Sequence, residues 1–326
     1  MEKKYLGNTG IEVTPVGMGV LTIGHTQLDS TLEEGAAVVR HAIESGINFF
    51  DTAEFYRTYH YIARALKDLR SSFDSGALPR PVFSSKSLAS GYDGMLKAIE
   101  DCRAALDIDI IDIFLLHEVM QAPDFEMRES AWECLHDSKA KGKVKAIGIS
   151  THHADVALAA AGTPGMDILF PLINYRGFGI RKGEGEGTRE EMETAIDAAS
   201  GRGIGVYAMK VLCGGNFAGE YIESLDYATS LSGVQSVMLG MGSKRDVDDA
   251  VAYFCGRLPR DYKPDVKDKK MFVDKSDCIG CGACMEKCTS GAVIYGANGS
   301  AEIDHEKCIR CGYCVPVCPT RALIFL

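Results

Sequence analysis

The feature that most constrains this chain is a pair of matched cysteine runs in its last fifty residues. The eight cysteines are Cys278, Cys281, Cys284 and Cys288 in the first run and Cys308, Cys311, Cys314 and Cys318 in the second. Each run reads Cys-x2-Cys-x2-Cys-x3-Cys, and Pro319 follows the second. Short spacings of this kind place three thiolates around one face of an iron–sulfur cube. The pattern therefore predicts two 4Fe–4S clusters, and a protein that carries them passes single electrons.

The cysteine segment is also an internal repeat. Its period is 30 residues, the separation of Cys278 and Cys308, and Gly282 and Gly312 occupy matching positions. Each half is too short to bury a core of its own, so the two halves must pack together. Metal binding would supply folding free energy that so small a core lacks. We expect one compact module over 272–326, preceded by a charged, proline-containing linker over 257–271.

This module resembles the two-cluster bacterial-type ferredoxins, in which the fourth cysteine of each run binds the other cluster. The resemblance implies a small α+β ferredoxin-like domain with a crossed ligand set. One cluster would be held by Cys278, Cys281, Cys284 and Cys318, and the other by Cys308, Cys311, Cys314 and Cys288. A purely structural role for the clusters is the alternative to electron transfer.

Composition narrows the class of protein. The 326 residues carry a formal charge of −10, and no basic stripe suggests a nucleic-acid surface. No apolar run approaches the roughly 18 residues needed to span a bilayer, and the N-terminal residues lack the apolar segment of a secretory signal. We expect a cytoplasmic protein without nucleic-acid or membrane partners, because free thiolates persist in a reducing compartment. The remaining cysteines are predicted to be buried small hydrophobes: Cys102, Cys134, Cys213 and Cys255.

Short apolar strands alternate with amphipathic helices over residues 1–256. Eight strands separated by helices favour a (β/α)8 TIM barrel, an α/β fold, over an open sheet. The expected strands are 15–20, 47–51, 82–86, 111–117, 144–150, 168–173, 204–210 and 234–239.

Two capping patterns predict where helices begin. Ser30 with Glu33, and Thr188 with Glu191, each place a hydroxyl three residues before a carboxylate. Before the second pattern, the polar stretch 181–187 is expected to be a flexible loop, either a lid or a disordered bend.

Polar residues end three consecutive predicted strands. Asp51, Lys86 and His117 stand at these ends, and Tyr56 follows Asp51 by five residues. Active sites of such barrels lie at the C-terminal ends of the strands. Because four ionisable groups rarely converge on one barrel face by chance, we interpret them as a catalytic set.

Over roughly residues 1–255 the chain resembles the aldo-keto reductase family, through INFFDTAEFYR (47–57), VFSSKS (82–87) and DIFLLHEV (112–119). The resemblance implies that Tyr56 is the general acid and that Lys86, paired with Asp51, lowers the pKa of this tyrosine. It further implies that His117 orients and polarises a substrate carbonyl. Tyr59 and Tyr61 are alternatives to Tyr56, but the five-residue spacing favours Tyr56.

The chain departs from the family pattern around the nicotinamide cofactor. The family usually has glycine where Arg57 stands, Ser-Asn at Ser150-Thr151, and an aromatic residue at Met209. After the eighth strand, GMGSKR (240–245) could seat an anion at a helix N-terminus, although acidic residues follow directly. The implied cofactor-binding residues are Ser150, Gly242, Ser243, Lys244 and Arg245.

Two interpretations of how the barrel and the cysteine segment work together remain open. In the first, NADP(H) exchanges hydride with a carbonyl or alcohol, and the clusters act elsewhere. In the second, the clusters are the electron source or sink for chemistry at Tyr56, directly or through a flavin, and another ferredoxin or redox protein is the partner. A third hypothesis, of another class, is a non-catalytic electron-transfer protein whose barrel docks a redox partner. The retained catalytic set favours an oxidoreductase.

Overall fold

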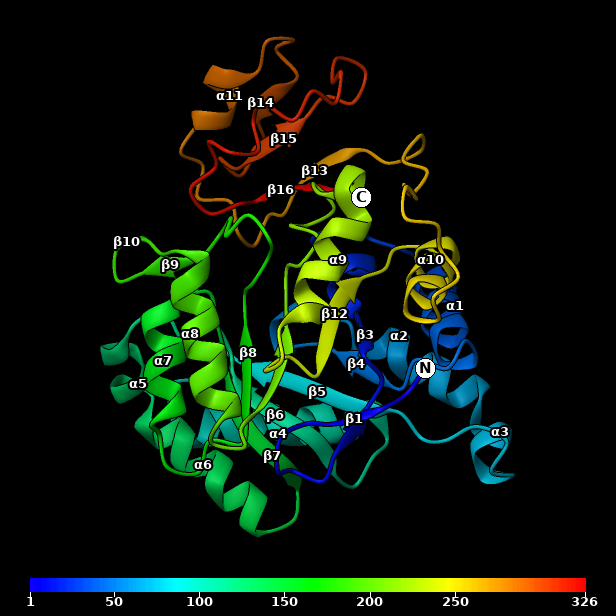
Figure 1. Ribbon diagram of the computed structural model, residues 1–326, viewed down its shortest axis with the longest axis vertical. Helices are drawn as coiled ribbons and strands as arrows, with labels where there is room; N and C mark the ends of the chain where they lie inside the picture. The colour runs from blue at the N-terminus through cyan, green and yellow to red at the C-terminus, as the bar shows by residue number, and fades with distance from the viewer.

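The computed structural model describes residues 1–326, with side-chain detail for all except residues 122 and 123. Eight parallel strands close into a barrel in the order β11-β12-β3-β4-β5-β6-β7-β8 (Figure 1). Their bounds are β3 Val16–Gly19, β4 Phe49–Asp51, β5 Val82–Ser87, β6 Ile111–Leu116, β7 Val144–Thr151, β8 Ile168–Pro171, β11 Gly205–Ala208 and β12 Ser236–Gly240. The predicted (β/α)8 fold is confirmed.

Helices surround the barrel and connect its strands (Figure 1). They are α1 Leu32–Glu44, α2 Tyr59–Asp68, α3 Arg70–Asp74, α4 Tyr92–Leu106, α5 Ala122–Met127, α6 Glu129–Ala140, α7 Ala154–Ala161, α8 Arg189–Ser200, α9 Tyr221–Ser230 and α10 Lys244–Phe254, with short 3₁₀ turns η1 Val20–Ile23, η2 Glu54–Tyr56 and η3 Ala218–Glu220. No helix in the described part of the chain is long and apolar enough to cross a membrane.

The helix caps correct one prediction and confirm another. Helix α1 is capped by Thr31 with Glu34, one residue later than expected, because the Ser30 carbonyl is engaged by the Tyr61 hydroxyl. Helix α8 begins at the predicted Thr188–Glu191 capping box. The one-residue error arose because both positions present a hydroxyl three residues before a glutamate.

The polar stretch before α8 is a short hairpin and not an unstructured bend. Strand β9 (Arg181–Lys182) pairs antiparallel with β10 (Gly185–Glu186). The Arg181 amide also donates to the His152 carbonyl at 2.9 Å, which ties the hairpin to the loop after β7.

Apolar side chains form two layers in the barrel. Those that point inward pack in its interior, among them Phe49, Ile113, Phe170 and Tyr207. Outward-facing strand residues pack against the helices. At one end the hairpin of β1 (Lys4–Tyr5) and β2 (Glu12–Val13) contributes to the interior layer. The opposite end holds the predicted site residues.

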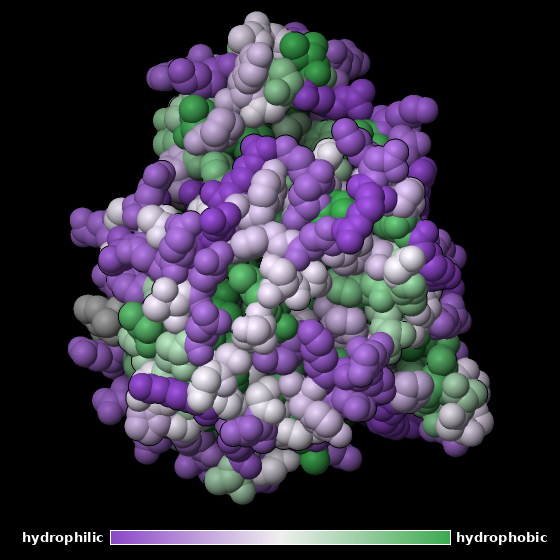
Figure 2. Space-filling model, in the orientation of Figure 1, coloured by the Kyte–Doolittle hydropathy of each residue, from purple (hydrophilic) through white to green (hydrophobic). Residues whose placement is uncertain are grey.

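The last 56 residues of the chain form a separate lobe over the C-terminal ends of the barrel strands, drawn in orange and red in Figure 1. Here β13 (Met271–Val273) pairs with β16 (Leu323–Phe325), and β14 (Val293–Tyr295) pairs with β15 (Ala301–Ile303). The lobe also contains the short helix α11 (Ala283–Lys287). We call this lobe the cysteine module. Figure 2 shows hydrophobic atoms, in green, on the surface of this lobe. Two exposed hydrophobic residues of the lobe are Ile279 and Ile309, which are 67% and 66% exposed.

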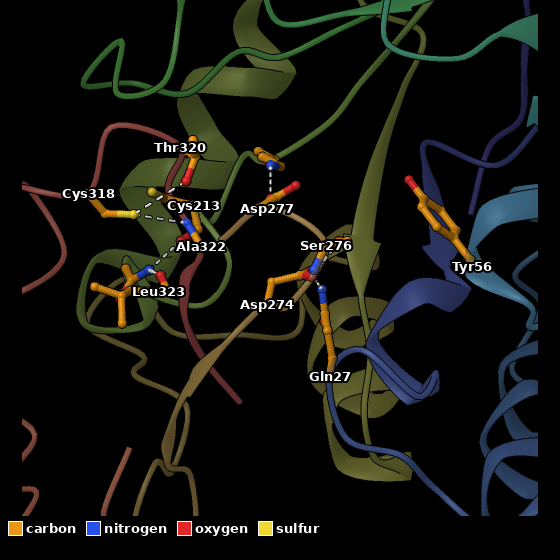
Figure 3. A network of polar contacts seen from close by, with 12 residues as sticks. Gln27, Tyr56, Cys213, Asp274, Ser276, Asp277, Cys318, Thr320, Ala322 and Leu323 are labelled. Atoms are coloured by element: carbon orange, nitrogen blue, oxygen red, sulfur yellow. Dashed lines mark hydrogen bonds and ion pairs between the residues drawn. The ribbon is translucent and has the colours of Figure 1, made fainter. Parts of the chain in front are cut away.

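Strand β16 attaches the cysteine module to the loop after β11. The Phe325 backbone amide donates to the Gly214 carbonyl at 2.8 Å. The side-chain amide of Asn216 donates to the carbonyl of Leu323, which is labelled in Figure 3, at 3.0 Å. Gly214 and Gly215 both have positive φ, and a Cβ on Gly215 would lie 1.9 Å from the Phe325 carbonyl oxygen. Glycine is therefore required for this approach.

Three of the four cysteines outside the two runs are buried and one is exposed. Cys102, Cys134 and Cys213 are buried as predicted, but Cys255 is exposed. Cys255 follows the last residue of α10 as its C-cap, so it lies beyond the face that packs on the barrel.

Candidate active site

Asp51 and Lys86 form a buried ion pair at the top of the barrel. Lys86 Nζ donates to Asp51 Oδ1 at 2.5 Å and to the Thr52 carbonyl at 2.7 Å. Both side chains are almost fully buried. Asp51 ends β4 and Lys86 lies in the adjacent β5, so neighbouring parallel strands bring the two together.

Tyr56 lies above this pair in the turn η2. Its hydroxyl is 3.4 Å from His117 Nε2, and Lys86 Nζ is 4.7 Å from the centroid of its ring. Tyr59 and Tyr61 bond elsewhere, to Ser85 and to the Ser30 carbonyl. The structure therefore brings together the predicted Asp51, Tyr56, Lys86 and His117, while the two other tyrosines lie outside the group.

Arg57 stands where the resemblance expected glycine, and it adopts the left-handed conformation with φ of +53°. A non-glycine residue is strained there. The turn that presents Tyr56 is thus kept, although its residue type differs from the family pattern.

Burial dominates the ionisation of Tyr56. Burial raises the pKa of Tyr56 well above its ordinary value, and the nearby carboxylate of Asp51 adds to this effect. The ammonium of Lys86, which is paired with Asp51 and bonded to the Thr52 carbonyl, does not outweigh the effect of burial on this pKa. A phenol in this environment stays protonated at neutral pH, which is the form that donates a proton.

Burial also acts on the two members of the ion pair. It raises the pKa of Asp51 and lowers that of Lys86, and in each case the partner charge acts in the opposite direction. Asp51 gains a second interaction at Oδ2, 3.3 Å from the Tyr207 hydroxyl, and that hydroxyl also bonds Ser84 at 2.7 Å. This inward network of Tyr207 and Ser84 was not anticipated from the sequence.

His117 is held neutral beside Tyr56. Burial lowers the pKa of His117 well below its ordinary value, and the positive charges of Lys86 and Arg128 lower it further. Its Nδ1 has no hydrogen-bond partner among the side chains that the structure describes. Arg128, buried at the start of α6, donates to the carbonyls of His117 and Ser87 at 2.8 and 2.9 Å, which holds the ends of β5 and β6 in place. No sequence pattern marked Arg128.

The four residues predicted to be catalytic line a cavity of about 320 Å³ that the barrel and the cysteine module share. The barrel contributes Asp51, Tyr56, Lys86 and His117 to its wall. The cysteine module contributes Asp274, Ser276, Asp277 and the last three residues of the chain. Figure 3 shows how two contacts join the domains at this cavity. Gln27 Nε2 donates to Asp274 Oδ2 at 2.8 Å, and Lys210 Nζ lies 3.4 Å from Asp277 Oδ2.

The residues predicted to hold a nicotinamide cofactor do not converge. Ser150 lines the cavity, and its hydroxyl accepts the Glu118 amide at 2.9 Å. At the start of α10, the amides of Gly242 and Ser243 both donate to Asp246 Oδ2 at 3.0 Å. Lys244 and Arg245 are exposed, and Arg245 lies 3.4 Å from Asp265.

This helix start does not fit a bound phosphate. The Asp246 carboxylate occupies the amide donors that an anion would use, and Lys269 from the linker bonds its other oxygen at 2.9 Å. A helix N-terminus attracts anions through such free amides. The backbone amides at the start of α10 are therefore already hydrogen-bonded to a side chain of the same helix.

The cysteines of the module gather in two groups of four around separate cavities. One cavity is lined by Cys278, Cys281, Cys284 and Cys318, and the other by Cys288, Cys308, Cys311 and Cys314. Backbone amides point at three of the sulfurs, from Ala301 to Cys278, Ala292 to Cys288 and Ala322 to Cys318, at 3.1 to 3.3 Å. Such donors stabilise thiolates that bind iron–sulfur clusters.

Among the side chains described, no three His, Cys, Asp or Glu are placed to hold a single metal ion. The grouping of the thiols matches the crossed sets implied by the sequence, and thiolate is the donor that iron–sulfur clusters take.

Comparison with known proteins identifies both parts of the chain. The sequence profile of the Aldo/keto reductase family matches residues 15–232, and that of the 4Fe-4S dicluster domain matches residues 271–326. L-galactose dehydrogenase of Arabidopsis thaliana is 26% identical over 167 residues, which cover 48% of this chain and 50% of that protein. Glyoxal reductase of Bacillus subtilis is 25% identical over 214 residues, 64% of this chain and 67% of that protein.

Similar solved structures show the same barrel. An aldo-keto reductase from Bacillus halodurans in its holo form has a TM-score of 0.62 at 17% identity, covering 79% of this chain and 92% of that one. The Bombyx mori aldo-keto reductase in complex with NADP has a TM-score of 0.59 at 16% identity, covering 81% and 95%. At such identities the likeness shows the fold alone. The chain spans about half the length of several curated relatives that it matches.

Proposed function

Because the chain belongs to the aldo/keto reductase family and carries a 4Fe-4S dicluster domain, it is an oxidoreductase, and we propose that it interconverts a carbonyl and a hydroxyl group at Tyr56. The observation that carries the proposal is the placement of a protonated phenol beside a neutral imidazole at the wall of a shared cavity. Substrates are small carbonyl or alcohol compounds that fit about 320 Å³.

In the reductive direction a carbonyl gains two electrons and two protons: Tyr56 donates the proton to the substrate oxygen, and the proton on the carbon comes from solvent in the shared cavity. His117 Nε2 hydrogen-bonds the same oxygen and fixes its position, since the imidazole is neutral and faces the Tyr56 hydroxyl. As Tyr56 loses its proton, the nearby ammonium of Lys86 stabilises the phenolate. Asp51 keeps Lys86 charged and oriented. In the oxidative direction the same groups accept the proton.

The cysteine module would hold two 4Fe–4S clusters through the two groups of four thiols, and bound clusters supply single electrons. We favour this electron source over NADP(H) because Asp246 fills the anion site at the start of α10. Another ferredoxin or redox protein would then be the external partner.

Replacing Tyr56 by Phe tests the catalytic role. Removing the phenolic proton should lower turnover by about 10²- to 10⁴-fold, the usual contribution of a general acid. The measurement is anaerobic reduction of a panel of small aldehydes and ketones by dithionite-reduced holoprotein, with the iron–sulfur absorbance recorded in parallel. The matched control is Tyr59→Phe, which should retain turnover because its hydroxyl bonds Ser85 outside the catalytic group.

Equal turnover in the Tyr56→Phe variant and the parent would refute the proton-donor role. Absence of turnover with every carbonyl in the panel, in both directions, would favour the non-catalytic electron-transfer hypothesis. A parallel titration with NADPH decides the electron source, because bleaching of the cluster absorbance by NADPH would contradict our preference.

A further inference from the structure

The shared cavity carries more negative than positive charge. Apart from the ion pair of Asp51 and Lys86, two lysines and five acidic residues line its wall. They are Lys210, Lys269, Glu118, Asp246, Asp249, Asp274 and Asp277. A cleft lined by an excess of one charge attracts ligands of the opposite charge and repels those of the same charge. The cavity as a whole therefore disfavours ligands that carry a phosphate or a carboxylate.

Most of these acidic residues are bonded to other side chains or lie far from the catalytic group. Asp246, Asp274 and Asp277 each have a side-chain partner at the domain interface, at 2.9, 2.8 and 3.4 Å. Asp249 lies on α10, which follows β12, the strand opposite β6 in the closed barrel. Glu118 follows β6, and no hydrogen bond or ion pair of its carboxylate occurs within the described part of the chain. Glu118 is therefore the unpartnered carboxylate on the β6 side of the cavity.

Glu118 is held beside the catalytic group by its backbone. It directly follows His117 and adopts the left-handed conformation, with φ of +53°. Its amide donates to the Ser150 hydroxyl at 2.9 Å, which fixes the chain at this point. Strained residues that are not glycine concentrate at functional sites. Because His117 Nε2 lies 3.4 Å from the Tyr56 hydroxyl, Glu118 lines the cavity next to the position of the substrate carbonyl.

The charges around Glu118 leave it without a counterion. Burial raises the pKa of Glu118, and Asp277 and Asp124 raise it further. Lys210 and Arg128 act in the opposite direction. Each of these two cations is paired with one of the aspartates, Lys210 with Asp277 at 3.4 Å and Arg128 with Asp124 at 4.0 Å. The two pairs offset one another, so the charge of Glu118 itself is not neutralised.

We propose that Glu118 is a specificity-determining residue that binds an ammonium group of the substrate, and that the preferred substrates are short amino-carbonyl compounds or the corresponding amino alcohols. An ammonium group supplies the counterion and the hydrogen bonds that the carboxylate lacks within the protein. Its charge also complements the excess of acidic residues in the cavity. The inference rests on the proposed function for the reaction at Tyr56, but the binding of the ammonium group can be measured without that reaction.

Three ketones of similar size and different charge test the proposal. They are aminoacetone, which is cationic at neutral pH, hydroxyacetone, which is neutral, and pyruvate, which is anionic. Each gains two electrons and two protons at its carbonyl when dithionite-reduced holoprotein is the anaerobic electron donor. We expect kcat/KM for aminoacetone to exceed that for hydroxyacetone about tenfold, the size of effect that one hydrogen bond to a charged group gives. Pyruvate should be the poorest substrate, and the difference should lie in KM more than in kcat.

Glu118→Gln keeps the size of the side chain and removes its charge. The ratio of kcat/KM for aminoacetone to that for hydroxyacetone should fall about tenfold in this variant. The matched control is Glu129→Gln, which removes the charge of an exposed glutamate outside the cavity and should keep the parent ratio. A parent protein that does not prefer aminoacetone, or a Glu118→Gln variant that keeps the preference, would overturn the proposal.

Calorimetric binding to the oxidised holoprotein separates this inference from the proposed function. The probes are 1-amino-2-propanol, 1,2-propanediol and lactate, the alcohols that correspond to the three ketones. We expect 1-amino-2-propanol to bind about tenfold more tightly than 1,2-propanediol, and Glu118→Gln to remove this difference. Equal binding of these two alcohols by the parent overturns the inference, and this comparison decides if Glu118→Gln does not fold. Selective binding of the amino alcohol without reduction of any ketone would contradict the proposed function and support the ammonium site.

Discussion

At the scale of single residues, burial decides the ionisation of the four residues that we propose to be catalytic. It keeps His117 neutral and Tyr56 protonated, and it makes Lys86 depend on Asp51 for its charge. A buried ammonium without its carboxylate would be an uncompensated charge, which proteins rarely tolerate. Desolvation keeps these side chains in the protonation states that the proposed proton transfer requires. It also lowers the stability of the folded protein at any pH that forces one of them to become charged.

His117 should make stability depend on pH. Its pKa is lowered in the folded protein, so below about pH 6.5, the ordinary histidine value, the unfolded chain binds a proton that the folded chain does not. The stabilisation is present above that pH and is lost as pH falls, by up to about 1.4 kcal/mol per unit. Urea unfolding of the holoprotein between pH 8 and 5.5 measures this slope.

The histidine variants identify the source of the slope. His117→Asn should reduce the fall in unfolding free energy, and His152→Asn should reduce it independently, because burial lowers the pKa of His152 as well. A slope that persists undiminished without His117 would show that other groups carry the dependence.

At the scale of elements, strand β16 and the loop after β11 decide whether the two domains share one cavity. The contact consists of two hydrogen bonds and a close approach that only glycine permits. Because β16 also pairs with β13, a shift of this one strand would move the module residues that line the cavity.

We expect Gly215→Ala to separate the cysteine module from the barrel. The new methyl group would collide with the Phe325 carbonyl, at a position where φ is +82°. Limited proteolysis should then cut faster between α10 and β13, and turnover should fall while the iron–sulfur absorbance stays. Gly219→Ala is the matched control, since nothing lies within 4 Å of an added Cβ there. Equal proteolysis of the two variants would argue against the role of this contact.

At the scale of the whole molecule, the two domains differ in the size of their hydrophobic cores. The core of the cysteine module is small and includes its cysteines. The cysteine module packs a small core of residues such as Met271, Val293, Ala301 and Leu323 against the cysteines themselves. The barrel has the much larger core of two layers. A core as small as that of the module supplies little stability without bound metal.

Removing iron should therefore unfold the module and spare the barrel. Treatment of the holoprotein with a chelator and an oxidant is expected to make the last 56 residues protease-sensitive, while the far-ultraviolet circular dichroism of the barrel persists. Mass spectrometry of the fragments locates the cuts. Cleavage throughout the barrel at the same rate would mean that the two domains unfold together.

Much of the site was readable from the sequence because strand ends and cysteine spacings are local patterns. Asp51, Lys86 and His117 could be placed by the period of the strands, and the capping box of Thr188 by its spacing. Arg128 and Tyr207 could not, because a buried arginine or tyrosine has no pattern that distinguishes it before packing is known. The expected loop at 181–187 became a hairpin through pairing that composition does not reveal.

The sequence by itself determined the barrel, the two groups of thiols and the chemical types at the strand ends, since each follows from spacing along the chain. Only the tertiary structure decided which buried side chains are ionised, which residues cover the cavity, and how the cysteine module is joined to the barrel. Desolvation and contacts between distant segments produce these properties, as in Asp274 and Asp277 of the module lining the cavity of Tyr56. The two cysteine runs look like a separate electron carrier in the sequence, but in the folded molecule the segments that flank them, 274–277 and 324–326, line the cavity of Tyr56.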